Sequence, residues 1–206
     1  METAAITTLI NKGTITNGGA GADAIYSAGP QASIGLLLNS GQMVGAVDLL
    51  GGWGDTLDNL GSISGNIALA GGDILNNQEQ VYGDVTLAGS DTLTDRGAIH
   101  GSVTLGASDT INDSGGAILG VISASNSDIF DYAGLFGNET IDNFVVSGSN
   151  HDTIQLAAND FGSFQAVHHA ISQVGSDTVI RLDAADSITL VGVTKSSLVA
   201  ADFKFV

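Results

Sequence analysis

The sequence predicts an all-β fold: a right-handed parallel β-solenoid, of the β-roll or β-helix type, with coils of about 18 residues. Three observations predict it: an internal repeat of nearly constant period, alternation of apolar and small polar residues inside each copy, and a turn-forming composition. The 206-residue chain has 29 glycines and one proline, and its acidic residues are mostly aspartate. Glycine and aspartate favour turns over helix interiors. The length suits a single domain.

The repeat is clearest when its copies are aligned on the glycine that opens each one. The successive starts are 20, 18, 18, 19 and 17 residues apart, at Gly45, Gly65, Gly83, Gly101, Gly120 and Gly137. A fixed period with small slips is typical of a solenoid, whose units contact only their neighbours. A β-sandwich of short strands is the alternative, but a sandwich gives no reason for a constant phase.

Each copy contains three short apolar segments, which we expect to form strands with one buried face. Stacking the copies about 4.8 Å apart aligns these segments into apolar ladders. The first predicted ladder contains Leu57, Leu75, Leu93, Ile111, Phe130 and Ile141. The other ladders are Ile63, Val81, Ile99 and Ile118; Val47, Ile67, Val85 and Val103; and Leu49, Leu69, Leu87 and Leu105.

The chain divides into three parts of one continuous structural domain. We expect N-terminal coils with an insertion or cap over residues 1–44, the repeat solenoid over residues 45–143, and a C-terminal cap over residues 144–206. The insertion Ser27–Gln42 caps the N-terminal end, or else the chain starts within a longer solenoid. The segment Asn11–Asn17 favours the second option, because it resembles a third-face segment of the repeat.

The C-terminal part is expected to contain one short helix. Its apolar residues at helical spacing lie between Ser163, a plausible N-cap, and Gly175, a plausible stop. Two strands are predicted after it, over residues 177–182 and 186–193. Such a segment can cover the open end of the solenoid, whose last coil would otherwise expose unpaired strand edges.

An acidic residue recurs at one place in successive copies and predicts an acidic ladder. Its members are Asp55, Asp73, Asp91, Asp109, Asp128 and Glu139. Like charges on neighbouring coils repel each other. Either the carboxylates accept backbone N–H bonds in the turns, or divalent cations lie between the coils. Calcium suits the second case because it takes roughly six to eight oxygen ligands.

The loop Gly18–Tyr26 indicates calcium more directly. It matches the nine-residue pattern G-G-x-G-x-D-x-U-x, where U is a large apolar residue, found in the calcium-binding solenoids of RTX proteins. The turns of the later copies match less of this pattern, so we expect at most one calcium-binding edge. With calcium as the cofactor, the predicted metal-binding residues are Gly18, Gly19, Gly21, Asp23, Gly51, Gly52, Gly54, Asp55, Asp73, Asp91, Asp109 and Asp128.

Residues 143–206 resemble the C-terminal region of RTX-type proteins, the hemolysin-type calcium-binding repeat proteins. In that family the last residues often pair an acidic residue with a short apolar tail, which Asp202, Phe203, Phe205 and Val206 match. The resemblance implies type I secretion from a Gram-negative bacterium, contact of the C-terminus with the secretion machinery, and a secreted, extracellular location. The middle coils depart from the family, because only one half of each coil carries the aspartate. Those coils also resemble repeats of some autotransporter passengers.

Composition excludes several classes of function. With 5 basic against 22 acidic residues and a net charge of −17, the chain offers no basic patch to nucleic acid. There is no cysteine for a disulfide or thiolate site, and we expect no transmembrane helix. His168 and His169 are adjacent on the predicted helix, so they do not form the paired histidines of a zinc protease motif. No catalytic residue is predicted.

Three functions follow as hypotheses. The first is an RTX-like, non-catalytic, calcium-binding structural module of a cell surface or extracellular matrix, with polysaccharide or cell-surface components as partners. The alternative is a polysaccharide-acting enzyme, or the non-catalytic C-terminal part of a larger secreted enzyme; paired carboxylates such as Asp91 and Asp95 allow it. The third is ice or surface binding by a flat threonine face. Thr86 and Thr104 stack, but the array is short.

Overall fold

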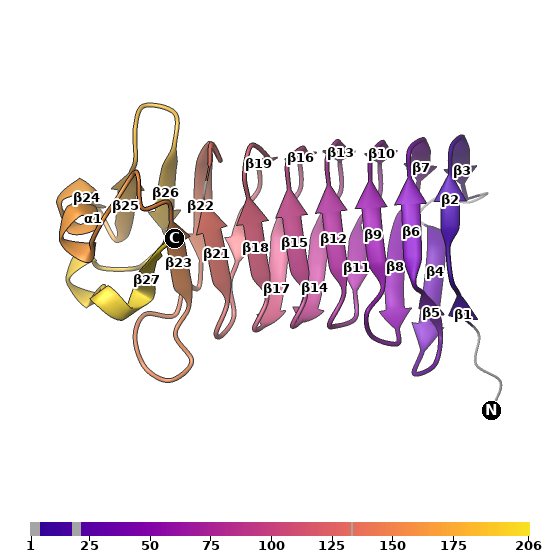
Figure 1. Cartoon of the computed structure of the whole chain (residues 1–206), viewed down its shortest axis with the longest axis horizontal. Coiled ribbons are helices and arrows are strands. Elements are labelled where there is room, and N and C mark those ends of the chain that lie inside the picture. Colours follow the sequence, from indigo (N-terminus) through magenta and orange to yellow (C-terminus); the bar gives the residue numbers. More distant parts are fainter. Residues whose placement is uncertain (1–4, 18–21, 133) are drawn as a thin grey trace.

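A computed structural model of the chain describes residues 5–17, 22–132 and 134–206. It shows a right-handed parallel β-solenoid of about seven turns, with one α-helix near the C-terminus. The coils lie side by side along the long axis of the molecule, and the C-terminal residues gather at one end (Figure 1). The predicted fold class is therefore confirmed.

Three sheets form the faces of the solenoid, and a regular coil contributes one strand to each. Among the described residues, the first face contains β3 (Thr14–Thr16), β7 (Gln42–Val44), β10 (Ser62–Ile63), β13 (Gln80–Val81), β16 (Ala98–Ile99) and β19 (Ala117–Ile118). The second contains β4 (Asp23–Gly29), β8 (Ala46–Gly51), β11 (Ile67–Leu69), β14 (Val85–Gly89), β17 (Val103–Ala107), β20 (Ile122–Ser123), β22 (Asn138–Asp142) and β26 (Ser187–Leu190). The third contains β2 (Leu9–Asn11), β6 (Leu36–Asn39), β9 (Thr56–Asn59), β12 (Ile74–Asn77), β15 (Thr92–Asp95), β18 (Thr110–Asp113), β21 (Ile129–Tyr132), β23 (Thr153–Leu156) and β27 (Phe203–Phe205). Beside these faces, β1 (Ala5–Ile6) pairs with β5 (Ser33–Ile34).

The apolar ladders form the core in the predicted register, with one exception. Leu57, Leu75, Leu93, Ile111 and Phe130 are successive partners on the third face, and all are fully buried. The ladders on the first and second faces are confirmed in the same way.

The exception is Ile141, which does not follow Phe130. Ile141 pairs with Ile122 on the second face, and the partner of Phe130 is Ile154. The copy that starts at Gly137 begins with the second-face strand β22, and a longer loop separates β22 from the third-face strand β23. The expected position of Ile141 was therefore wrong by one face.

Glycine opens the copies from Gly65 to Gly120 because two coils approach closely at the corner between the first and second faces. A methyl group added to Gly83 would lie 2.3 Å from the carbonyl oxygen of Gly65. The same distance separates Gly101 from the carbonyl of Gly83, and Gly120 from the carbonyl of Gly101. No larger residue fits there without moving the backbone.

The segment Ser27–Gln42 is part of a coil and not a cap. It continues from β4 through a wide turn at Pro30 into β5 and β6, and it ends where β7 begins. The strand β3, within Asn11–Asn17, pairs with β7 on the first face. The cap expectation is therefore wrong, and the segment Asn11–Asn17 forms the predicted coil segment.

The C-terminal part contains the helix α1 (Phe164–Ala170), which begins where predicted. The Ser163 hydroxyl accepts the N–H of Ala166 at 3.3 Å. The helix ends earlier than predicted, because Ile171–Val174 forms the strand β24, which pairs antiparallel with β25 (Asp177–Arg181). Gly175, with φ of 64°, makes the turn between them rather than ending the helix.

The remaining C-terminal elements continue the solenoid. Strand β25 pairs antiparallel with β26, whereas β26 and β27 pair parallel with β22 and β23. Two 3₁₀ turns, η1 (Lys195–Ser197) and η2 (Ala200–Asp202), precede β27. Both predicted strands are confirmed. Within the described part of the chain, no helix is long and apolar enough to cross a membrane.

Replacing Ser163 with alanine should lower the free energy of unfolding by about 1 kcal/mol. The reason is that the Ser163 hydroxyl accepts an N–H of the first turn of α1. Ser163→Asp keeps an acceptor at the same position and should preserve stability. Urea unfolding of both variants measures the difference. Equal losses in the two variants would contradict a capping role.

Candidate functional site

The predicted aspartate ladder lies at the corner between the second and third faces. The residue before each aspartate adopts the left-handed conformation, with φ between 60° and 84°, at Gly54, Gly72, Ser90, Ser108 and Ser127. This conformation is strained for serine. Hydrogen bonds made by the adjacent aspartate side chains hold the turn in place.

In this ladder, each aspartate from Asp73 onwards accepts two backbone N–H groups. The N–H of Asp91 donates to Oδ1 of Asp109 at 2.8 Å, and the N–H of Gly106 donates to Oδ2 at 2.8 Å. The first bond joins neighbouring coils, and the second closes the turn of the aspartate's own coil. The same arrangement recurs at Asp73, Asp91, Asp128 and Asp152. Backbone N–H groups, the first of the two predicted remedies, therefore offset the repulsion along the ladder.

Asp152 continues this ladder, and Glu139 does not belong to it. The N–H of Asp128 donates to Asp152 at 2.9 Å, and Asp202 accepts N–H groups from Ser147 and Val199 in the next turn. The expectation for Glu139 was wrong for the same reason as that for Ile141: both lie on β22 of the second face. The phrase Asp152–Thr153–Ile154 repeats the aspartate–threonine–apolar pattern of the earlier turns, and this signal could have identified Asp152.

Burial raises the pKa of several carboxyls of the ladder. The pKa values of Asp109 and Asp128 rise to about 6, first because of burial and to a smaller extent because of neighbouring aspartates. Burial also raises the pKa of Asp55 and Asp73. Backbone N–H bonds to these carboxylates oppose the shift.

Asp23, the described acidic residue of the motif that most directly indicates calcium, lies at a different corner. Gly18, Gly19 and Gly21 fall outside the described residues. Asp23 opens β4 beside the corner between the first and second faces, whereas Asp55–Asp128 lie at the corner between the second and third. Among the described residues, Asp23 and the ladder aspartates therefore lie at two different corners. Burial, and then the charge of Asp23, raises the pKa of nearby Asp48 on β8.

The glycines of the turn after β8 allow close packing against the Pro30 turn. A methyl group on Gly51 would lie 2.6 Å from the carbonyl oxygens of both Gly29 and Ala32. Gly52 and Gly54 have positive φ, of 70° and 84°. In this turn the side chain of Trp53 is 79% exposed. The steric need for these glycines is independent of any ion.

Asp55 differs from the later ladder members. Its Oδ1 accepts the N–H of Ile34 at 3.1 Å, while its buried Oδ2 has no hydrogen-bond partner among the residues described. Over residues 5–17, 22–132 and 134–206, no group of three or more His, Cys, Asp or Glu side chains is placed to hold a metal ion.

A second polar ladder lies inside the solenoid, and the sequence analysis missed it. It follows the corner between the third and first faces, where each asparagine amide donates to the next side chain at 2.7 or 2.8 Å, through Asn11, Asn39, Asn59, Asn77 and Asp95. We call this row, extended to Asp113, the amide ladder. The sequence signal for this ladder is an Asn or Asp two residues before a corner glycine, as in Asn11–Gly13.

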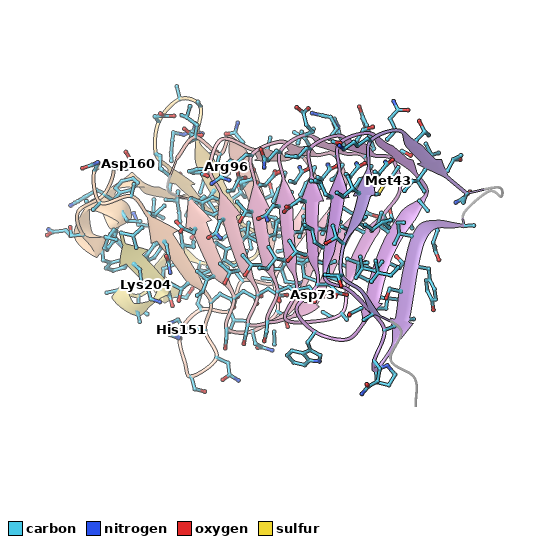
Figure 2. All side chains as sticks on the ribbon, turned by 45° about the vertical axis from the view of Figure 1, so that its right-hand side comes forward. Met43, Asp73, Arg96, His151, Asp160 and Lys204 are labelled. Carbon is cyan, nitrogen blue, oxygen red and sulfur yellow. The ribbon has the colours of Figure 1, made fainter. Side chains whose placement is uncertain are left out.

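A cleft of about 550 Å³ lies between the coils and the C-terminal cap, beside Asp160, Asp183 and Asp186. Asp160 is exposed at that end of the molecule (Figure 2). Asp183 and Asp186 each accept two backbone N–H bonds, which hold the loop before β26 and the start of β22. Oδ1 of each of these two carboxyls is therefore engaged with the backbone.

No protein-family model and no curated protein matches this chain. The fold and the geometry of the two ladders therefore carry the functional argument.

Proposed function

We propose that this chain is a secreted, RTX-like structural module: a non-catalytic β-solenoid of a cell surface or extracellular matrix that binds calcium. The observation that carries the proposal is the use of its repeated polar residues. Both oxygens of Asp73, Asp91, Asp109 and Asp128 bind backbone N–H groups, and one of these bonds crosses to the next coil. The repeat is thus organised for stacking, which is what an extended structural module requires.

The proposed calcium site is the loop Gly18–Asp23, with Asp48 as a further ligand. Asp23 and Asp48 are close enough for the charge of one to raise the pKa of the other. A divalent cation would relieve this repulsion, and a glycine-rich loop offers backbone carbonyls as additional ligands. The aspartate ladder is not part of the proposed site, because from Asp73 to Asp128 both oxygens of each member already accept N–H bonds.

Secretion by a type I system is proposed from the resemblance of residues 143–206 to the C-terminal region of RTX-type proteins. The last strands, β26 and β27, lie against β22 and β23, so the C-terminal residues cover the end of the solenoid. A cap at the C-terminus suits a chain that folds after export. The three-faced coil differs from a coil of two nonapeptides, so the module is RTX-like rather than a regular RTX roll.

Calcium should raise the melting temperature of the native chain and have little effect on Asp23→Asn. A ligand at about 100 times its dissociation constant stabilises by about 2.7 kcal/mol, which corresponds to roughly 5–10 °C for a chain of this size. Thermal unfolding followed by circular dichroism, in calcium and in chelator, measures the shift. Asp160→Asn removes an exposed charge at the other end and should respond as the native chain does. An equal shift in Asp23→Asn would contradict the site, and no shift in the native chain would contradict calcium binding.

A further inference from the structure

The first four members of the amide ladder show what this corner requires of a side chain. The carbonyl Oδ1 of Asn59 accepts the amide of Asn39, and its Nδ2 donates to Asn77. The same Nδ2 donates to the backbone carbonyl of Gln80 at 3.3 Å. Each position therefore needs an acceptor facing the previous coil and a donor facing the next.

Aspartate replaces asparagine at the last two positions, so an oxygen stands where the donor should be. Oδ1 of Asp95 accepts the amide of Asn77 at 2.7 Å, and Oδ1 of Asp113 accepts the N–H of Gly116 at 3.1 Å. Oδ2 of both aspartates is buried and has no hydrogen-bond partner within the described structure. A methyl group on Gly116 would lie 2.7 Å from Oδ2 of Asp95 and 2.9 Å from Oδ1 of Asp113, so both oxygens lie beside one glycine.

Two further buried groups lie at the end of this row. Tyr132 follows Asp113 in the register of the third face, and its hydroxyl has no hydrogen-bond partner among the described residues. Glu139 on β22 accepts the N–H of Ile118 at 3.3 Å, which is an N–H of the last strand of the first face. Oε2 of Glu139 is buried and also lacks a partner in the described part of the chain.

The charged groups that act on this row are acidic. Asp113 experiences the charges of Asp95 and, from the loop before β26, Asp186. Glu139 experiences those of Asp113 and Asp95. The basic residue next to Asp95 in the chain, Arg96, is exposed (Figure 2). Ionising all of these buried carboxyls would be costly, because burial and like charges both oppose it.

We propose that Asp95 and Asp113 are neutral carboxylic acids that take the place of asparagine amides, and that with Glu139 they form a proton-dependent lock between the coils. A protonated carboxyl has the shape of an amide, and its O–H supplies the missing donor. This inference is independent of calcium binding at Asp23.

The lock should weaken as pH rises. Burial first, and neighbouring carboxylates second, raise the pKa of Asp113 to about 7 and that of Glu139 to about 8; burial also raises the pKa of Asp95. In the unfolded chain these groups titrate near pH 4. Between about pH 4 and 8 the folded state therefore binds more protons than the unfolded state, so stability falls as pH rises and levels off above about pH 8.

The double variant Asp95→Asn/Asp113→Asn supplies permanent amide donors and should remove part of this pH dependence. At pH 8 we expect it to melt at least about 5 °C above the native chain, and the difference should shrink towards pH 5. Asp58→Asn/Asp160→Asn removes two charges outside the ladder and should follow the native curve. Equal slopes in all three proteins would overturn the proposal.

Infrared spectroscopy of the native chain in D₂O at pH 7 gives a second test that does not depend on a variant folding. We expect the carbonyl band of a protonated carboxylic acid, and we expect it to weaken in the double variant. Absence of this band in the native chain would overturn the proposal. So would a calcium-dependent rise in melting temperature at pH 8 that the double variant alone loses, because a cation and not a proton would then fill the site.

Discussion

Replacing Gly83 with alanine is expected to lower the free energy of unfolding by about 3 kcal/mol. The added methyl group would lie 2.3 Å from the carbonyl oxygen and 2.4 Å from the carbonyl carbon of Gly65. Both atoms belong to the backbone of the neighbouring coil, which cannot rotate away as a side chain can. The two coils would have to separate, and this would weaken the hydrogen bonds on both adjacent faces.

Gly13→Ala is the matched control, because nothing lies within 4 Å of a methyl group at that position and its backbone has no positive φ. We expect no loss there, and a gain of up to about 1 kcal/mol from the stiffer unfolded chain. Urea denaturation with circular dichroism detection measures both variants. If Gly83→Ala were as stable as Gly13→Ala, close approach of the coils would not be the reason for the glycine.

Removing the carboxylate of Asp109 is the second large perturbation. Asp109→Ala leaves the N–H groups of Asp91 and Gly106 buried without an acceptor, and each such loss costs about 1–3 kcal/mol. A total near 3 kcal/mol is expected in urea unfolding. Native-state hydrogen exchange should show faster exchange at these two amides than the global loss of stability explains.

Asp109→Asn distinguishes the contributions of the two oxygens, because it replaces one of them with an NH₂ group. An amide keeps one acceptor and turns a donor towards the other N–H, so we expect about half the loss seen with alanine. Asp160→Ala, at an exposed aspartate, should change stability by less than about 0.5 kcal/mol. A loss in Asp109→Ala no greater than that of Asp160→Ala would show that the N–H bonds contribute little.

The register of the coils could be predicted because a large apolar residue recurs at the same position of each copy. Leu57, Leu75, Leu93 and Ile111 are 18 residues apart, and any shift of one position would turn them to solvent. The prediction failed where the period failed. At Ile141 and Glu139 the motif is incomplete, so alignment by glycine alone placed both on the wrong face.

The sequence identified the recurring aspartates, but it could not show whether they bind a metal ion. A recurring aspartate fits a turn cap and a calcium ligand equally well, and the N–H partners decide between these roles. In the structure both oxygens of Asp91 are engaged by Asp73 and Gly89. The motif Gly18–Asp23 is a full match in sequence, and its calcium binding is a prediction that thermal unfolding can test.

The repeated apolar pattern was enough to predict the solenoid, its period and its buried ladders, because equivalent positions stack on one another in successive coils. The structure alone showed that Glu139 lies beside the buried corner that holds Asp95 and Asp113, because this arrangement depends on packing between coils. The positions of Asp95 and Asp113 before the corner glycines indicate their row, but no sequence pattern links that row to Glu139. Their environment depends on β22, whose Glu139 accepts the N–H of Ile118 on β19. This is a contact between segments of different coils.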